Sequence, residues 1–226
     1  MASRTGGSRP VVRRNRDKQI LDAAVRIFAD KGYSGASLQD VADAVGLLKG
    51  SLYHYISSKQ SLLYRILQEA HQDATALVNS VDELQLPPDA HLREVVKRLT
   101  LFYLADPQRA RVYFNEWRYL TGKERTTVLR QRREFEDYIC QSVERTHAAG
   151  LTRADLDVKV ATFYLLAAVN GVLTWYRPGG PLSADKIAAE VALLSCTGVL
   201  TSGGSGRTSG ATGSVRATTA RRKVSS

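Results

Sequence analysis

The 226-residue chain has few residues of the kinds that build covalent or metal frameworks. Its two cysteines, Cys140 and Cys196, lie far apart and outside any metal-ligand spacing. A disulfide scaffold or a structural zinc site is therefore not expected. Because no apolar N-terminal run resembles a signal peptide, we expect a cytoplasmic protein with reduced thiols and no cofactor or metal.

Catalytic constellations are also lacking. The four histidines, His54, His71, His91 and His147, are scattered along the chain, and no paired acid and base residues or nucleophile motif accompany them. The sequence therefore predicts no catalytic residues and a protein that is not an enzyme.

Basic residues outnumber acidic residues at both ends of the chain. Residues 1–60 hold ten Lys and Arg against five Asp and Glu, residues 200–226 hold five against none, and the segment between is balanced. The formal net charge of +10 therefore lies at the two ends. Such asymmetry indicates a polyanionic partner, either nucleic acid or a membrane surface, although a solubilising surplus would produce it equally well.

Long hydrophobic runs are nearly absent. Residues 160–176 form one stretch of seventeen residues without a charge, at the lower limit for a membrane span. Charged residues flank it closely and Asn170 interrupts it, so we expect a buried helix and no membrane association.

Period-two alternation is missing as well, and helical spacing runs through the chain, which predicts an all-α fold. The first helix carries Ile20 to Phe28 and should end at Lys31-Gly32; Ser37 should cap a second, two-turn helix. Further helices are expected at 59–81, 90–105, 107–119, 123–149, 157–176 and 183–200. The domains predicted are a disordered basic arm at 1–12, a three-helix unit at 13–60, a larger helical unit at 61–200 and a disordered basic tail at 201–226.

The stretch VADAVGLLKGSLYHYISSK, residues 41–59, has the spacing of a helix-turn-helix. Ala42 supplies a small residue at the crossing, Gly46 tolerates φ > 0 at the turn, and Leu52 closes the wedge between the helices. With Leu52 facing inward, the outward face of the second helix can enter a DNA major groove.

Several residues are candidates for DNA contact. Small residues at the front of the helix permit close approach, the positive end of the helix dipole faces phosphate, and basic residues of the first helix reach phosphates or the minor groove. The candidates are Arg13, Arg14, Arg16, Lys18, Ser37, Lys49, Gly50, Ser51, Tyr53, His54 and Lys59. Tyr53 has half-buried packing as its alternative role, His54 is undecided, and the alternative for Lys59 is a solvated lysine rather than a phosphate clamp.

Residues 13–63, and above all SLQDVADAVGLLKGSLYHYISSKQSLL, resemble the DNA-binding domain of TetR-family transcriptional repressors. The matching residues are Ser37, Val41-Ala42, Ala44-Val45-Gly46, the run 50–56 and Lys59. Leu48 departs from the Ser or Thr usual at the cap, and Ile56 departs from the commoner Phe. The resemblance implies a helical effector domain and a homodimer formed through the last two helices.

Two segments bear on that dimer and on the effector. Residues 157–176 are apolar around most of the helix, and the last helix carries Ile187, Val191 and Leu194 as a packing stripe. Residues 174–187, TWYRPGGPLSADKI, resemble the acyl-CoA-sensing TetR branch. Arg130, Arg132 and Arg133 could hold CoA phosphates, but each has an acidic residue at i+4, which favours a solvated face.

Aromatic residues and one amide are the candidate effector contacts, with ordinary core packing as the alternative for most of them. They are Tyr103, Phe114, Trp117, Phe135, Tyr138, Phe163, Asn170 and Trp175. The function predicted is a DNA-binding repressor released from a palindromic operator by a small hydrophobic or acyl-CoA effector. The alternatives are an architectural DNA-binding protein with little sequence preference and, from a different class, a helical enzyme or lipid carrier.

Overall fold

The computed structural model describes residues 9–201, with side chains from Arg14 onward, and is helical without a named strand over that range. An isolated bridge joins Thr152 to Leu200. The helices are α1 (Arg9–Gly35), α2 (Leu38–Ala44), α3 (Lys49–Leu52), α4 (Lys59–Asp82), α5 (Pro88–Ala105), α6 (Pro107–Asn115), the 3₁₀ turn η1 (Glu116–Tyr119), α7 (Gly122–Ala148), α8 (Val158–Trp175) and α9 (Ala184–Thr197). The all-α prediction is confirmed.

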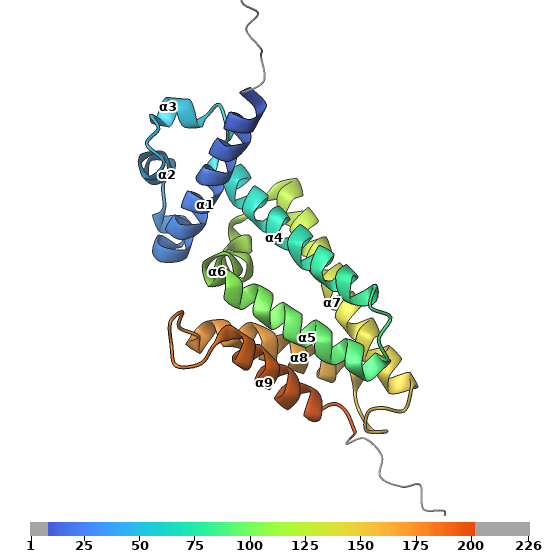
Figure 1. Ribbon diagram of the computed structural model, residues 1–226. Coiled ribbons are helices and arrows are strands. Elements are labelled where there is room, and N and C mark those ends of the chain that lie inside the picture. Colours follow the sequence, from blue (N-terminus) through green and yellow to red (C-terminus); the bar gives the residue numbers. More distant parts are fainter. Residues whose placement is uncertain (1–8, 202–226) are drawn as a thin grey trace, which may run out of the picture.

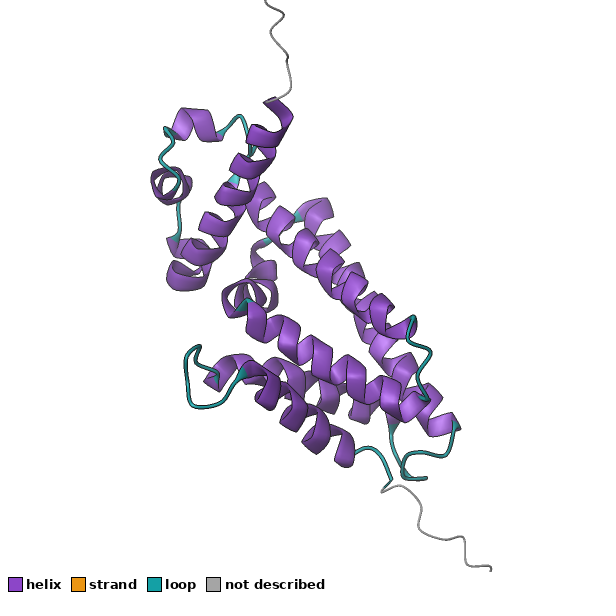
Figure 2. Cartoon of the chain, viewed as in Figure 1, coloured by secondary structure: helices purple, strands orange, loops and turns teal. Residues whose placement is uncertain are grey.

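Helices α1 to α3 lie together at one end of the molecule, and α4 leads from them into the larger body formed by α5 to α9 (Figures 1 and 2). The first helix begins at Arg9, inside the segment 1–12 that was predicted as a disordered arm, and its regular part ends at Gly32, where φ is 69° and ψ is 159°. The stop predicted at Lys31-Gly32 is therefore confirmed. Arg13 lies in α1, but its side chain is outside the described residues, as is the basic tail beyond residue 201.

Two hydrophobic cores support these two parts. The N-terminal core joins α1, α2 and α3 to the first half of α4, and it also takes Val112 from α6, Leu120 from the end of η1 and Val128 from α7. The C-terminal core joins α5, α7, α8 and α9 to the second half of α4. Because α6 and η1 contribute to the N-terminal core, the end formed by α1 to α3 is packed directly on the larger body.

Helix α8 is long and apolar enough to cross a membrane by length and composition, and a third of it is buried in the fold. It packs against α5, α7 and α9, which accounts for its inward face. Its outward face and that of α9 carry exposed apolar side chains. We call these five residues the α8–α9 face: Val160, Phe163, Tyr164, Leu193 and Leu194.

The α8–α9 face corrects part of the expected packing stripe. Ile187 is buried, as predicted, but Leu194 is 67% exposed and points away from the core. Seven residues turn a helix by only about 20° less than two full turns, so Ile187 and Leu194 lie on nearly the same side of α9. The buried face of α9 is centred on Ala188, Ala192 and Ser195, and Leu194 lies at its margin.

Candidate nucleic-acid interface and ligand cavities

A reciprocal cap fixes the start of α2. The Ser37 hydroxyl accepts from the Asp40 backbone N–H at 3.1 Å, and the Asp40 carboxylate accepts from the Ser37 N–H at 2.7 Å. Lys31 donates to the other Asp40 oxygen at 2.6 Å. The bonds from Lys31 and Ser37 hold the pKa of Asp40 far below its usual value. The predicted cap is thus confirmed, while contact between Ser37 and DNA stays a prediction.

The turn after α2 sets the angle to α3. Gly46 has φ of +65°, as the sequence required, and the Leu47 N–H donates to the Ala42 carbonyl at 2.9 Å. Ala42 and Leu52 are both fully buried at the crossing. Arg16 donates to the Val45 carbonyl at 3.2 Å, so this arginine ties α1 to the turn rather than extending freely toward phosphate.

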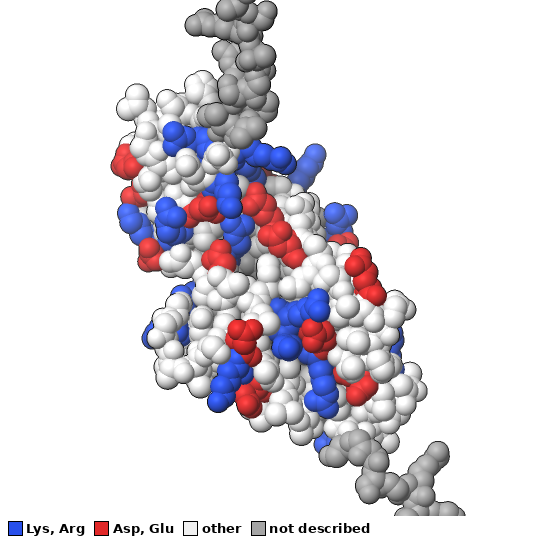
Figure 3. Space-filling view, in the orientation of Figure 1, with Lys and Arg blue, Asp and Glu red and all other residues white. Residues whose placement is uncertain are grey.

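The side of α3 opposite Leu52 is open. Lys49, Gly50 and His54 are exposed, Tyr53 is 51% exposed, and Ser51 is half-buried. The structure therefore brings the predicted face together. Basic side chains gather over the end of the molecule that α1 to α3 form, with acidic ones among them (Figure 3).

Helix α3 itself is shorter than the sequence suggested. It spans only Lys49–Leu52, and Leu48, at its N-cap, is 80% exposed and makes no side-chain cap bond. A single turn sums few peptide dipoles, so the helix-dipole contribution expected at the DNA phosphate is small. Recognition must depend on the exposed side chains instead.

Lys59 was expected to contact a DNA phosphate, but its ammonium group is bonded within the protein. Its ammonium group donates to the carbonyls of Ala36 at 2.5 Å and Ser34 at 3.4 Å, and it lies 4.3 Å from the centre of the Tyr33 ring. Burial lowers the pKa of Lys59. These contacts join the start of α4 to the segment between α1 and α2, which the one-dimensional pattern did not indicate.

The candidate effector residues do not share one cavity. Tyr103 lines a small apolar slot of about 40 Å³ between α4, α5 and α6. Phe114 and Asn170 line an open groove of about 670 Å³ between α6 and α8. Phe163 and Trp175 are 46% and 53% exposed on α8 and line neither of these two cavities, and their contact with an effector stays a prediction.

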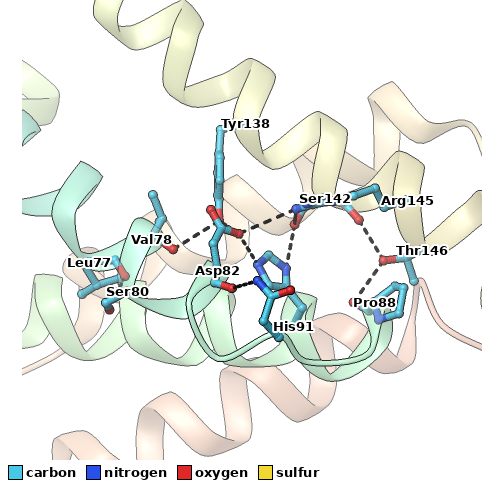
Figure 4. Close-up of polar contacts among 11 residues, drawn as sticks. Leu77, Val78, Ser80, Asp82, Pro88, His91, Tyr138, Ser142, Arg145 and Thr146 are labelled. Atoms are coloured by element: carbon cyan, nitrogen blue, oxygen red, sulfur yellow. Dashed lines mark hydrogen bonds and ion pairs between the residues drawn. The ribbon is translucent and has the colours of Figure 1, made fainter.

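Phe135 and Tyr138 lie on α7, and Tyr138 belongs to a polar network with α4 and α5 (Figure 4). The Tyr138 hydroxyl donates to the Asp82 carboxylate at 3.0 Å. His91 lies 2.8 Å from the same carboxylate and 3.0 Å from the Ser142 hydroxyl. Burial and the Asp82 carboxylate raise the pKa of Tyr138.

This Ser–His–Asp chain was not apparent in the sequence, because its members come from three helices. Ser142 is 1% exposed within α7, and its hydroxyl also accepts from Arg145 at 3.2 Å. Through these bonds Ser142 and His91 link α7 to α5 and α4. In the described part of the chain, no group of His, Cys, Asp and Glu side chains is suited to a metal ion.

Arg132 differs from the solvated residue that its i+4 neighbour suggested. Arg130 pairs with Glu134 at 3.7 Å, whereas the guanidinium of Arg132 turns inward, 5.3 Å from the Trp117 ring centre and 5.4 Å from that of Tyr113. One Arg132 nitrogen and the Trp117 indole nitrogen are buried without a hydrogen-bond partner among the described residues. Trp117, a candidate effector residue, therefore packs against an arginine.

Comparison with known proteins accords with this arrangement. Residues 20–66 match the model of bacterial regulatory proteins of the tetR family, and residues 85–199 match the tetracyclin repressor-like C-terminal domain. The chain is 31% identical to the transcriptional repressor KstR2 of Rhodococcus jostii over 176 residues, which cover 77% of this chain and 86% of the relative.

Solved structures resemble the whole fold. The ketosteroid transcriptional regulator KstR2 of Mycobacterium tuberculosis superposes with a TM-score of 0.78 at 21% identity, covering 89% of this chain and 99% of the other. AibR, solved in complex with isovaleryl coenzyme A and operator DNA, has a TM-score of 0.73 at 27% identity, covering 79% and 97%. From its two matching domains and its relatives, the chain belongs to the TetR family of bacterial transcriptional regulators.

Proposed function

We propose that the protein is a homodimeric repressor that binds a palindromic operator and leaves it when an acyl-CoA thioester binds. The observation that carries the DNA-binding part is the exposed surface of α3, where Lys49, Gly50, Tyr53 and His54 stand together above a buried wedge. Arg14 and Lys18, exposed on α1, extend this surface toward the phosphates beside the groove. Such a protein works in the cytoplasm and needs no catalytic step.

The α8–α9 face supports the dimer. Val160, Phe163 and Tyr164 recur at helical spacing on α8, and Leu193 and Leu194 continue the surface on α9, which packs beside it. Exposed apolar side chains on two adjacent helices are typical of a surface that a partner covers. A second copy of the chain would form a four-helix interface and place two α3 helices on successive half-sites, roughly 34 Å or somewhat further apart.

The effector class rests on similarity and on the site. AibR was solved with isovaleryl coenzyme A, and the relatives named KstR2 include one described as a ketosteroid regulator. Residues 174–187 of this chain resemble the acyl-CoA-sensing branch. An acyl thioester acts by population shift if it binds the DNA-free conformation more tightly than the DNA-bound one.

Footprinting on the DNA flanking the protein's own gene tests the proposal at near-physiological salt. We expect a palindromic protected site that is lost when one member of a panel of acyl-CoA thioesters is added. Smeared protection without boundaries, with a specificity ratio near one, would instead support an architectural DNA-binding protein. Protection that no thioester changes would leave the repressor and refute the effector class.

Substitutions then locate the interface. Lys49→Ala should weaken binding and reduce the dependence of affinity on salt by about one ion, whereas Tyr53→Ala should weaken binding with less change in that slope. Arg153→Ala, an exposed arginine in the connection between α7 and α8, is the matched control and should leave operator affinity unchanged. If both α3 variants bind the operator like the wild type, the interface is wrongly placed.

A further inference from the structure

Two cavities meet beside Arg109, where α1 crosses the start of α6. One is an open groove of about 870 Å³, lined mainly by charged residues of α1, α4 and α6. The other is the apolar slot of about 40 Å³ between α4, α5 and α6, bounded by Ala70, Ala74, Tyr103, Ala110 and Tyr113. Phe102, Asp106 and Arg109 line both cavities, so the slot borders the groove at these three residues.

Arg109 ties the two parts of the protein together at this border. Its side chain is 17% exposed and lies 3.3 Å from the Asp22 carboxylate of α1, 3.2 Å from the Glu69 carboxylate of α4 and 3.4 Å from the Asp106 carboxylate. Asp106 also caps α6 by accepting from the Arg109 backbone N–H at 3.0 Å. A largely buried guanidinium that holds three carboxylates fixes the position of α1 relative to α6.

The groove is lined by five basic and five acidic residues, but the two signs are unevenly distributed. Three of the carboxylates surround Arg109, and the rest of the groove holds four basic residues against two acidic ones, Asp17 and Asp73. The basic residues are Arg14, Lys18, Arg26 and Arg65. Within residues 9–201, none of these four has a carboxylate within 4.0 Å. The surface therefore suits a head group that carries several phosphates, next to a slot that suits a small apolar group.

We propose that a short-chain acyl-CoA binds here, with its phosphates in the groove and its acyl group in the slot, and that it draws Arg109 away from Asp22. This inference rests on the proposed function and assigns its effector a site and a route to the DNA. The thioester carbonyl then lies at the border and accepts from Arg109, while the phosphates lie further along the groove on the cations of α1. Losing the Asp22 contact frees α1 from α6.

The site also explains why effector and operator exclude each other. Arg14 and Lys18 line the groove and are candidate contacts to operator phosphates. A ligand phosphate that uses these two cations removes them from the DNA, because one cation is neutralised by one anion at a time. The small slot further implies that a short branched acyl group binds better than a long one.

Calorimetric titration of the full-length protein with isovaleryl-CoA, palmitoyl-CoA and free CoA, followed by operator binding with each, tests this site. In the wild type, isovaleryl-CoA should bind most tightly and lower operator affinity about tenfold or more. Ala74→Phe fills the slot and should weaken isovaleryl-CoA about tenfold while operator affinity stays within about twofold. Arg109→Gln should weaken the ligand by a similar factor and reduce the ligand's effect on operator affinity below about twofold.

Two further variants keep the test decisive. Arg26→Glu reverses an exposed, unpaired groove cation and should weaken isovaleryl-CoA even if Ala74→Phe does not fold. Arg130→Gln, on the exposed face of α7, is the matched control and should bind like the wild type. If isovaleryl-CoA releases the wild type and every groove and slot variant equally, this site is wrong and the repressor stands. If no thioester releases the wild type from its footprint, both the effector class and this site fail.

Discussion

At the scale of single residues, the DNA-binding end depends on polar side chains that work inside the fold before any DNA is present. Asp40 completes the cap of α2 and pairs with Lys31, and both contacts require its ionised carboxylate. Lys59 uses its ammonium group to join the start of α4 to the Ser34 and Ala36 carbonyls. Sequence patterns identify such residues as polar and exposed, but the partner on another segment decides what each one does.

The acid sensitivity of this end should trace to Asp40. The bonds from Lys31 and Ser37 hold the folded-state pKa of Asp40 below its ordinary value of 3.8, so the unfolded chain binds the proton more readily. The stabilisation by the Asp40 carboxylate is fully present above the unfolded-state pKa. It is lost as the pH falls from there toward the lower folded-state pKa. Asp40→Asn should therefore be less stable than the wild type at pH 7, with the difference shrinking at pH 3, as measured by urea unfolding.

Asp43 offers the matched control for that experiment. Its carboxylate is exposed and accepts a single bond from Gln39, at 2.7 Å. Asp43→Asn should follow the wild-type pH profile. A stability difference for Asp40→Asn that stays constant from pH 7 to pH 3 would show that the cap does not depend on its charge.

Lys59→Met should lower stability as well as DNA affinity. The variant keeps most of the apolar stem but loses the bonds to the Ala36 and Ser34 carbonyls, at a cost of about 1–2 kcal/mol. Chemical unfolding measures this loss. If the variant has wild-type stability and weakened operator binding, the result would instead support the contact between Lys59 and a DNA phosphate that the sequence suggested.

At the scale of elements, the orientation of the recognition surface depends on the turn between α2 and α3, where the backbone takes a positive φ. Gly46 has φ of +65°, and a Cβ built there meets no atom within 4 Å. Gly46→Ala therefore tests conformation alone, and we expect a loss of about 1 kcal/mol in unfolding free energy.

Gly50→Ala, with an ordinary φ and equally open surroundings, should keep its stability and lose operator affinity, because the methyl group holds DNA away.

The helix boundaries were predictable because they depend on local chemistry. The cap at Ser37 and the stop at Gly32 lie within a few residues of the helix ends that they determine. The length of α3 was not, since Leu48 gives it no side-chain cap and only the buried Leu52 anchors it.

The candidate cavity was harder still to predict. Arg109, Asp22 and Glu69 are separated by 40 to 87 residues along the chain, and their meeting depends on how α1, α4 and α6 cross. The aromatic residues chosen from helical spacing are instead divided between core, groove and outer surface. A periodic pattern reports that a side chain is apolar and not which of several cavities it lines.

At the scale of the whole molecule, repression should require two copies, because a single α3 of four residues offers too little surface to bind an operator tightly. Leu194, 67% exposed on the α8–α9 face, is well placed to test this. Leu194→Glu should yield a folded monomer by analytical ultracentrifugation, with helical content unchanged and operator affinity reduced at least about tenfold, since a carboxylate buried in an apolar interface is strongly unfavourable. Leu84→Glu, 47% exposed after α4, should stay dimeric. A Leu194→Glu dimer that binds like the wild type would mean that the α8–α9 face serves another partner.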